Sequence, residues 1–169
     1  DILEGTAYDD INISLNGTPL TTITKTINGN ILTLTNTTSY TDGTYTLNIP
    51  ADAVVDAAGN ALETSFSSLF TVDTVAPVIT STDPVNGATN VSADKVITVT
   101  FSEPIKEGTG WFELIDRNTG AAVDFTTSIN GNVLTITPTS DLSEGWYKVI
   151  VHTGSVTDLA GNMVAVKSF

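Results

Sequence analysis

Apolar and polar residues alternate in short runs along the second half of the chain. Val96–Phe101 and Val133–Thr137 place an apolar side chain at every second position, which is the period of a strand with one buried face. Gly, Pro, Asn and Asp separate the runs, and no stretch has the period of a long amphipathic helix. The pattern predicts these strands: Val78–Thr82, Val96–Phe101, Trp111–Asp116, Ala122–Ser128, Val133–Thr137, Trp146–His152 and Met163–Phe169.

About seven short strands in the second half of the chain predict an antiparallel β-sandwich of immunoglobulin type. A local signal agrees with this topology. Leu142–Tyr147, with the sequence LSEGWY, has the spacing of a tyrosine corner, in which a tyrosine bonds back to the loop before its strand. Tyr40–Tyr45 has a similar arrangement in the first half of the chain. We therefore predict structural roles for Tyr147 and Tyr45.

One block of sequence occurs almost twice. DAAGN at Asp56–Asn60 returns as DLAGN at Asp158–Asn162, 102 positions later. The segments that lead into the two copies, Ala51–Asp56 and Gly154–Asp158, are expected to form short turns of helix. Matched spacing over several blocks indicates tandem domains. The other matching blocks are INGN, NILTLT with NVLTIT, TDGTYTLNI with SEGWYKVIV, and EGT.

The repeat predicts two domains of unequal completeness. We assign residues 1–72 to the first domain, 73–77 to a short linker and 78–169 to the second domain. In the second domain, residues 76–105 precede the EGT block and supply two strands, whereas the first domain has only Asp1–Leu3 there. The first domain is thus expected to lack its first two strands. Either the natural domain is cut ahead of Asp1, which we favour, or another chain supplies the strands, as in donor-strand complementation.

The linker and the end of the chain carry two smaller expectations. Pro77 fixes one φ angle in the segment Val72–Ile79, so the linker is expected to be a semi-rigid spacer. The first domain continues into Phe66–Thr74, whereas the second stops at Phe169. The last strand of the second domain is therefore expected to be trimmed.

Charge and composition exclude several partners and chemistries. The formal net charge of -13 argues against nucleic acid and anionic membranes as partners. The absence of cysteine excludes disulfides and zinc–thiolate sites. No run of about 18 apolar residues is present that could span a membrane. The acidity suits an extracellular, calcium-rich or high-salt setting.

The second domain contains three motifs: the opening AP-x-I-x-x-x-x-P-x-x-G-A-x-N-V (Ala76–Val91), FSEPI (Phe101–Ile105) and the closing V-x-D-x-A-G-N (Val156–Asn162). They resemble motifs of bacterial immunoglobulin-like domains, which are repeated in surface-layer (S-layer) proteins and large adhesins. The resemblance covers nearly all of the second domain and the first from about Glu4. It implies a non-catalytic, extracellular structural module, and some related modules hold calcium near domain joints.

The D-x-A-G-N loop of the second domain has two interpretations. In a sandwich of this type, loops before the first strand and after the second and sixth strands share one end. These loops bring oxygen-bearing side chains to the predicted domain joint, and such donors suit Ca²⁺. The candidate metal ligands are Asp73, Glu103, Asp158 and Asn162. Ordinary turn chemistry, with positive φ at Gly161, is the favoured interpretation, and Ca²⁺ is the alternative.

The aromatic residues and the single histidine give weaker signals. Trp111, Phe112, Trp146 and Tyr147 are expected to fill the core and sheet edges, as most aromatics of a sandwich do. Adjacent side chains of a strand point to opposite faces, so at most one residue of each adjacent pair is expected in the core. Exposure of Trp111 or Trp146 on a flat sheet face would instead favour carbohydrate binding. His152 has no nucleophile elbow of the G-x-S-x-G form near it, so catalysis is not expected.

The sequence therefore predicts a non-catalytic structural module of a bacterial cell-surface or S-layer protein. Its expected partners are neighbouring Ig-like domains of the same protein or assembly, with Ca²⁺ stiffening the joint. The alternative is an adhesin or carbohydrate-binding accessory module whose partner is a cell-wall or surface polysaccharide. No nucleic acid partner and no membrane insertion are expected.

Overall fold

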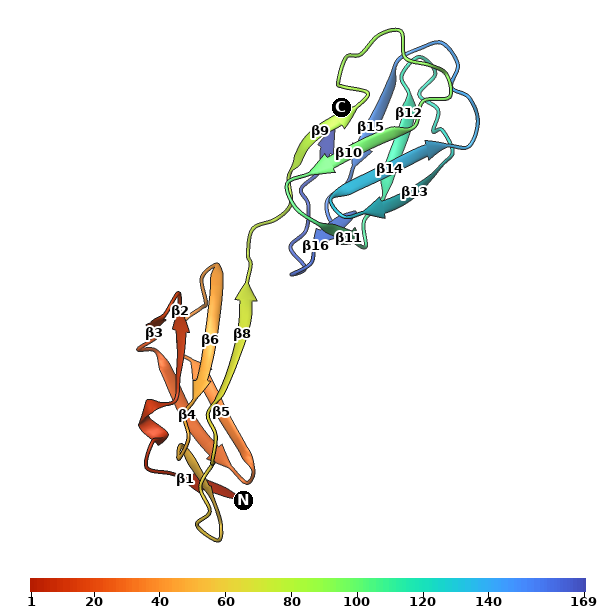
Figure 1. The fold of residues 1–169 in the computed structure, drawn as a ribbon. Coiled ribbons are helices and arrows are strands. Elements are labelled where there is room, and N and C mark those ends of the chain that lie inside the picture. The colour runs from red at the N-terminus through yellow and green to blue at the C-terminus, as the bar shows by residue number, and fades with distance from the viewer. The chain divides into compact units, whose positions relative to one another are not determined.

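The computed structural model describes the whole chain, Asp1–Phe169, as an all-β structure. Strands make up 48% of the residues, so the predicted all-β class is confirmed. The chain divides into two compact units, unit 1 (Asp1–Thr74) and unit 2 (Val75–Phe169). Figure 1 shows unit 1 in red to yellow and unit 2 in green to blue. A helix long and apolar enough to cross a membrane is not found.

Unit 2 has two main sheets and one short pair of strands. One sheet has the order β13–β14–β10–β9, and the other has the order β12–β15–β17. Strands β11 and β16 form a separate two-stranded ladder. The strands of unit 2 are β9 (Ile79–Asp83), β10 (Ile97–Phe101), β11 (Ile105–Glu107), β12 (Phe112–Asp116), β13 (Phe125–Asn130), β14 (Val133–Pro138), β15 (Tyr147–Val151), β16 (Val156–Asp158) and β17 (Lys167–Ser168).

The core of unit 2 is one cluster to which both main sheets contribute alternate residues. On β10, for example, Ile97, Val99 and Phe101 are buried while the threonines between them are partly exposed. This alternation is the pattern from which the strand was predicted. The cluster consists of Ile97, Val99, Phe101, Ile105, Leu114, Leu134, Ile136, Val149, Val151, Val156 and Val164.

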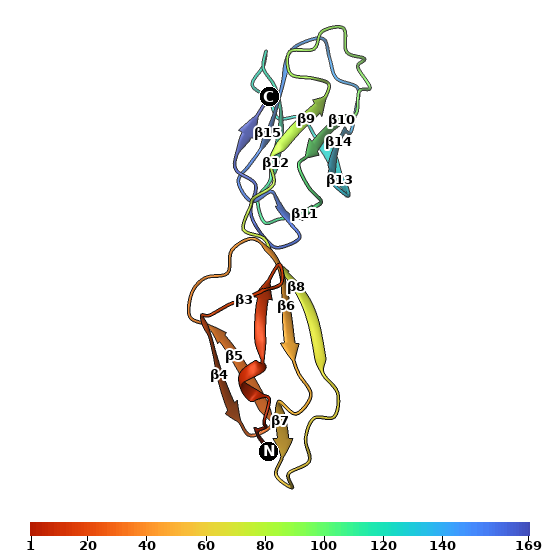
Figure 2. The same cartoon turned by 60° about the vertical axis from the view of Figure 1, so that its left-hand side comes forward.

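Unit 1 is built from smaller sheets. One sheet has the order β3–β2–β6–β8, and β4–β5 and β1–β7 are two-stranded ladders. Figure 2 shows β4 and β5 as a layer apart from β2, β6 and β8. The elements are β1 (Ile2–Glu4), the 3₁₀ turn η1 (Tyr8–Asp10), β2 (Asn12–Leu15), β3 (Thr18–Pro19), β4 (Ile23–Asn28), β5 (Ile31–Asn36), β6 (Gly43–Ile49), β7 (Val54–Asp56) and β8 (Phe66–Val72).

The two units repeat one framework. Strand β1 pairs with β7 as β11 pairs with β16, and hairpin β4–β5 matches β13–β14 in register. Leu32 takes the place of Leu134, and Leu34 that of Ile136. The counterparts differ in one respect: β14 has two neighbours, β13 and β10, whereas β5 has β4 alone.

The prediction of helical turns before the two D-x-A-G-N loops is wrong. Val54–Asp56 and Val156–Asp158 are short strands that pair with β1 and β11 respectively. The partner strands lie far away in the sequence, so a local pattern could not reveal the pairing. The last predicted strand is also shorter than expected, because only Lys167–Ser168 is assigned to β17.

The predicted tyrosine corners are confirmed. The hydroxyl group of Tyr45 donates to the carbonyl oxygen of Thr41 at 2.9 Å, and that of Tyr147 donates to Ser143 at 3.0 Å. Each bond ties the start of a strand, β6 or β15, to the loop that precedes it.

The repeated EGT block has a packing explanation. A Cβ atom on Gly5 would lie 2.1 Å from the carbonyl oxygen of Asp52, and one on Gly108 would lie 2.1 Å from that of Gly154. Real Cβ atoms do not approach backbone so closely, so only glycine fits at either position.

Replacing Leu134 by Ala should destabilise unit 2 by about 2–5 kcal/mol, because this side chain is fully buried. The same change at Leu32 should cost less, since Leu32 is only half-buried. Both tryptophans, Trp111 and Trp146, lie in unit 2, so tryptophan emission during urea unfolding reports that unit, while circular dichroism reports both. Equal losses of stability in the two variants would contradict the difference in packing.

Candidate functional site

The D-x-A-G-N loop of unit 2 is organised around the carboxylate of Asp158. Its Oδ1 accepts hydrogen bonds from the backbone N–H groups of Gly161 at 2.6 Å and Asn162 at 2.8 Å. Its Oδ2 accepts a bond from the side-chain amide of Asn162 at 2.7 Å. Gly161 has a φ of 104°, as the turn interpretation predicts. The turn chemistry expected from the sequence is therefore present.

The copy of this loop in unit 1 is built in the same way. Asp56 Oδ1 accepts bonds from the N–H groups of Ala58 at 2.9 Å and Asn60 at 2.8 Å, and Oδ2 accepts one from the Asn60 amide at 2.8 Å. The surroundings differ, because Asp158 is only 1% exposed whereas Asp56 lies in solvent. The two loops have similar sequences, but their aspartates differ in burial.

Hydrogen bonding decides the charge state of both loop carboxylates. Burial alone would raise the pKa of Asp158, but bonds from Asn162 and the loop backbone outweigh it and lower the pKa. The pKa of Asp56 is also lowered, chiefly by the side chain and backbone N–H of Asn60. A depressed pKa stabilises the fold above the unfolded-state pKa, and this contribution is lost as pH falls through the folded-state pKa.

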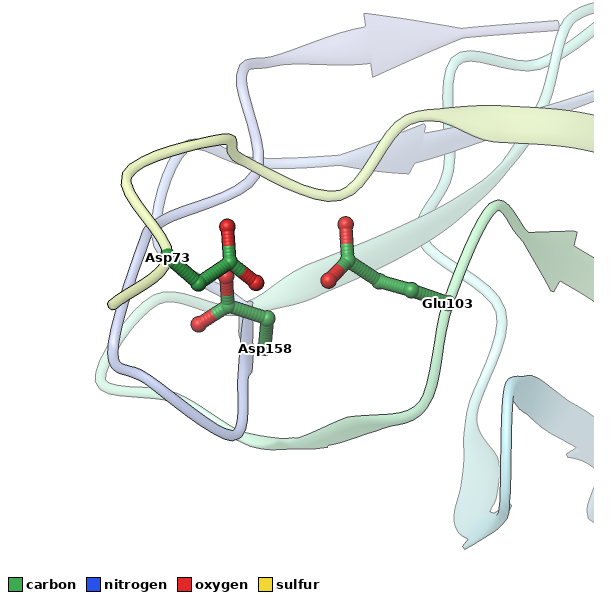
Figure 3. A group of neighbouring side chains, drawn as sticks. All are labelled: Asp73, Glu103 and Asp158. Atoms are coloured by element: carbon green, nitrogen blue, oxygen red, sulfur yellow. The ribbon is translucent and has the colours of Figure 1, made fainter. Parts of the chain in front are cut away.

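Three carboxylates gather beside this loop. Asp73 follows β8, Glu103 lies between β10 and β11, and Asp158 ends β16. One oxygen from each lies within 4.8 Å of the others, and Figure 3 shows the side chains around a common space. Asp158 is buried, Glu103 is half-buried and Asp73 is exposed. Like charges this close repel, so the group favours a neutralising cation.

The structure brings the sequence-predicted ligand residues together. Asn162, the fourth of them, lies beside the group through its bond to Asp158, and its amide also reaches the carbonyl oxygen of Val75 at 3.5 Å. The donors are oxygens from carboxylates, which suit Ca²⁺ rather than a metal that prefers sulfur or imidazole. Their role as metal ligands stays a prediction.

A second cluster lies on the outer face of sheet β12–β15–β17. Trp111 and Glu113 lie on the side of β12 opposite the buried Leu114, because successive side chains alternate. Trp111 Nε1 donates to Glu113 Oε1 at 3.0 Å, and His152 Nε2 lies 2.9 Å from the same oxygen. The rings of Trp111 and His152 stack with centroids 4.2 Å apart.

This cluster was missed as a unit by sequence reasoning. The spacing of Trp111 and Glu113 already places both on one face of a strand, which was the available signal. His152 joins them only through the register of β12 against β15. The backbone N–H of His152 donates to the carbonyl oxygen of Trp111 at 3.2 Å. The bonds from Trp111 and then His152 lower the pKa of Glu113.

Trp146 lies in a different environment. It lines an open groove of about 950 Å³ in unit 2, together with Asn90, Arg117, Glu144 and Phe169. Polar, charged and aromatic groups are therefore all presented to this one groove.

The prediction that at most one residue of each adjacent aromatic pair lies in the core is confirmed. Trp111 is 59% exposed and Trp146 is 53% exposed. Their sequence neighbours Phe112 and Tyr147 pack against the core instead. Strand alternation explains the outcome, since only one of two adjacent aromatic residues can face inward.

Comparison with protein families accounts for both units. The model of the bacterial Ig-like domain matches residues 1–72 and 73–169. The chain belongs to the bacterial Ig-like domain family. The resemblance and the tandem Ig-like β-sandwich fold predicted from the sequence are thereby confirmed. Asp73, Glu103 and Asp158 all fall within the second matched segment.

Bacterial Ig-like domains are typically structural, non-catalytic modules, and they commonly occur in cell-surface proteins. A comparison with curated proteins finds no match. The family thus supports the general class of function predicted from the sequence, a surface-protein module.

Replacing Asp158 by Ala should destabilise unit 2 by roughly 1–3 kcal/mol, because the N–H groups of Gly161 and Asn162 lose the buried carboxylate that accepts their partly buried hydrogen bonds. The matched variant Asp56→Ala should have a smaller effect, since water can replace the lost acceptor at an exposed loop. Urea unfolding at pH 7 and pH 3 measures both effects. The difference between wild type and Asp158→Ala should shrink at pH 3, and a difference independent of pH would contradict the low pKa.

Proposed function

We propose that the chain is a non-catalytic structural module of a bacterial cell-surface or S-layer protein. The observation that carries this proposal is the repetition of one Ig-like framework, matched by the family over residues 1–72 and 73–169. Repeated modules of one fold add length and spacing without requiring a site in each module. Their partners are neighbouring Ig-like domains of the same protein or assembly.

The composition supports an extracellular location for this module. The net charge of -13 favours solubility and disfavours binding to anionic polymers. Acidic side chains also suit a calcium-rich medium, because Ca²⁺ takes carboxylate and carbonyl oxygens as ligands.

Ca²⁺ is proposed as a stabilising ion of the matched segment 73–169, held by Asp73, Glu103 and Asp158. The three oxygens within 4.8 Å of one another support this role. Binding would offset the repulsion between the carboxylates and fix the segment that carries Asp73 to the loops after β10 and β16. Asn162 supports the site through its bond to Asp158.

Millimolar CaCl₂ should raise the melting temperature of unit 2 relative to EDTA, since an ion that binds only the folded state stabilises it by RT ln(1 + [L]/Kd). MgCl₂ should have a smaller effect, because Mg²⁺ demands stricter geometry and keeps its water. Tryptophan emission during heating reports the unfolding of unit 2, which contains both tryptophans. An identical melt in CaCl₂ and EDTA would remove Ca²⁺ from the proposal.

Two variants sharpen this measurement. Glu103→Gln keeps the size of the side chain but removes one negative charge, so it should abolish most of the Ca²⁺-dependent rise. Asp56→Asn alters the equivalent loop of unit 1, where no group of three carboxylates is found, so it should leave the rise intact. Loss of the rise in both variants would indicate general charge screening rather than a site.

A second candidate function is carbohydrate binding, either as an adhesin or as an accessory module. The exposure of Trp111 and Trp146 favours it, because an exposed indole offers a flat apolar face for a sugar ring. Trp146 is the better candidate, since it lines a groove with Arg117 and Glu144. Trp111 is already stacked on His152, which covers one of its faces.

Retention on immobilised bacterial cell-wall polysaccharide distinguishes the two functions. The structural module predicts no retention above that of an unrelated acidic protein. Carbohydrate binding predicts retention that Trp146→Ala reduces at least about tenfold, the loss of one stacking contact of ~1.4 kcal/mol. Trp111→Ala is the matched control for removing an exposed tryptophan.

A further inference from the structure

Strand β8 of unit 1 has one free edge along its whole length. It pairs with β6 over all seven of its residues, Phe66–Val72, without a bulge, and no strand lies on its other side. Figure 1 shows β8 as the last strand of its sheet. Such an edge exposes backbone donors and acceptors that can pair with another strand. Strand β3, at the opposite edge of this sheet, is only two residues long and contains Pro19, so it offers no comparable edge.

The free edge presents the backbone groups of alternate residues. Thr44 directs its carbonyl oxygen toward β2, where it accepts a hydrogen bond from the N–H of Asn16 at 3.4 Å. Backbone groups alternate between the two edges of an antiparallel strand, so those of Tyr45 point to β8. Phe70 lies opposite Tyr45, and its backbone groups therefore point to β6. The same alternation along β8 leaves three residues whose N–H and C=O groups point to the free edge: Ser67, Leu69 and Thr71.

Strand β8 also exposes apolar side chains. Phe66 is 52% exposed, Leu69 is 69% exposed and Phe70 is 36% exposed, and no other strand carries more than one exposed large apolar residue. In a chain with a net charge of -13, Phe66–Val72 contains neither a charged residue nor a proline. Charged residues and prolines are the usual protection of an edge strand against pairing. The β8 edge therefore lacks this protection.

We propose that β8 pairs antiparallel with β8 of a second copy of this chain, with Leu69 opposite Leu69. In a two-fold symmetric contact the same surface meets itself, so free-edge residues must face free-edge residues. This register meets the requirement, because Ser67 then lies opposite Thr71 of the other copy. Each of the three pairs exchanges two hydrogen bonds, which gives about six across the interface. The proposal concerns two copies of this chain and depends neither on a surface location nor on Ca²⁺.

The side chains of β8 fit this register. Opposite residues of an antiparallel pair point to the same face of the sheet and contact each other. Phe66 would therefore lie beside Val72 of the other copy, and the exposed Leu69 beside its own copy. On the face that carries Leu69, Ser67 would lie beside Thr71, and such hydroxyl pairs form hydrogen bonds across strands. Pairing thus covers the apolar groups that β8 exposes.

The charges beyond the two ends of β8 favour the same register. Continued past the strand, it places Asp73 opposite the uncharged Ser65 of the other copy. A register shifted by two residues would place Asp73 opposite Glu63, and like charges directly opposite each other destabilise a strand pair. The acidic residues therefore select the pairing centred on Leu69.

Sedimentation velocity of the full chain measures this association. We expect a monomer–dimer equilibrium between about 10 µM and about 1 mM. Because isologous pairing uses one edge of each copy, it closes after two copies. A chain that stays monomeric over this range, or that forms species larger than a dimer, would overturn the proposal.

Leu69→Lys tests the centre of the interface. Two lysines would then lie opposite each other, so the Kd of the dimer should rise at least about tenfold. Val85→Lys is the matched control, because Val85 is a similarly exposed apolar residue of unit 2 and the change in charge is the same. Each variant lowers the net negative charge, so general repulsion between copies cannot explain a weaker dimer. Equal Kd values for the two variants would contradict pairing through β8.

Hydrogen exchange followed by NMR tests the register. The amides of Ser67, Leu69 and Thr71 should exchange at least about tenfold more slowly in concentrated than in dilute protein. The amides of Ser68 and Phe70 already point to β6 and should change little. This alternation is specific to the free edge of β8. Protection that appears on another strand instead, such as β5, would place the contact elsewhere and overturn the proposal.

A single cysteine gives a test that does not require a tight dimer. The chain contains no cysteine, so Leu69→Cys introduces a unique thiol. Opposite Cα atoms of a hydrogen-bonded pair lie about 5.5 Å apart, so a short bismaleimide should join two copies. Val85→Cys is the control and should be joined at least about tenfold more slowly, because pairing does not raise its effective concentration. Equal rates of cross-linking would count against the β8 contact.

Discussion

Burial of one apolar sheet face against another is the constraint on which this structure depends. A sheet with one apolar face needs a second layer, because exposed apolar side chains give no stabilisation. In unit 2 both main sheets contribute alternate residues to one cluster. That packing fixes where β10 and β16 end, and so it fixes the positions of Glu103 and Asp158. Two of the three carboxylates of the candidate cation site, Glu103 and Asp158, are therefore carried by segments of this sandwich.

The two D-x-A-G-N loops show how one local structure can serve in different settings. Both use an aspartate to accept backbone and asparagine hydrogen bonds, so each loop is stable as a turn by itself. Only Asp158 is buried and lies near two further carboxylates. The turn and the proposed cation site are therefore compatible: the loop holds Asp158 charged and oriented, and two further carboxylates lie beside it.

In unit 2, successive side chains of a strand point alternately to the outer surface and to the core. Trp111 and Trp146 are exposed because Phe112 and Tyr147 take the inward positions beside them. The indole of Trp111 is held by its hydrogen bond to Glu113 and by stacking on His152, which contacts the same carboxylate oxygen. A structural module can thus present an ordered aromatic surface without any change to its framework.

The sequence by itself determined the all-β class, the tandem repeat, the tyrosine corners and the turn chemistry around Asp56 and Asp158. These features depend on period-two alternation and on contacts within a few residues, which are visible in a local window. The tertiary structure alone decided that 54–56 and 156–158 are strands, that His152 meets Glu113, and that Asp158 is buried while Asp56 is exposed. Each of these depends on the register or packing of segments far apart in the chain, and no local pattern specifies that pairing.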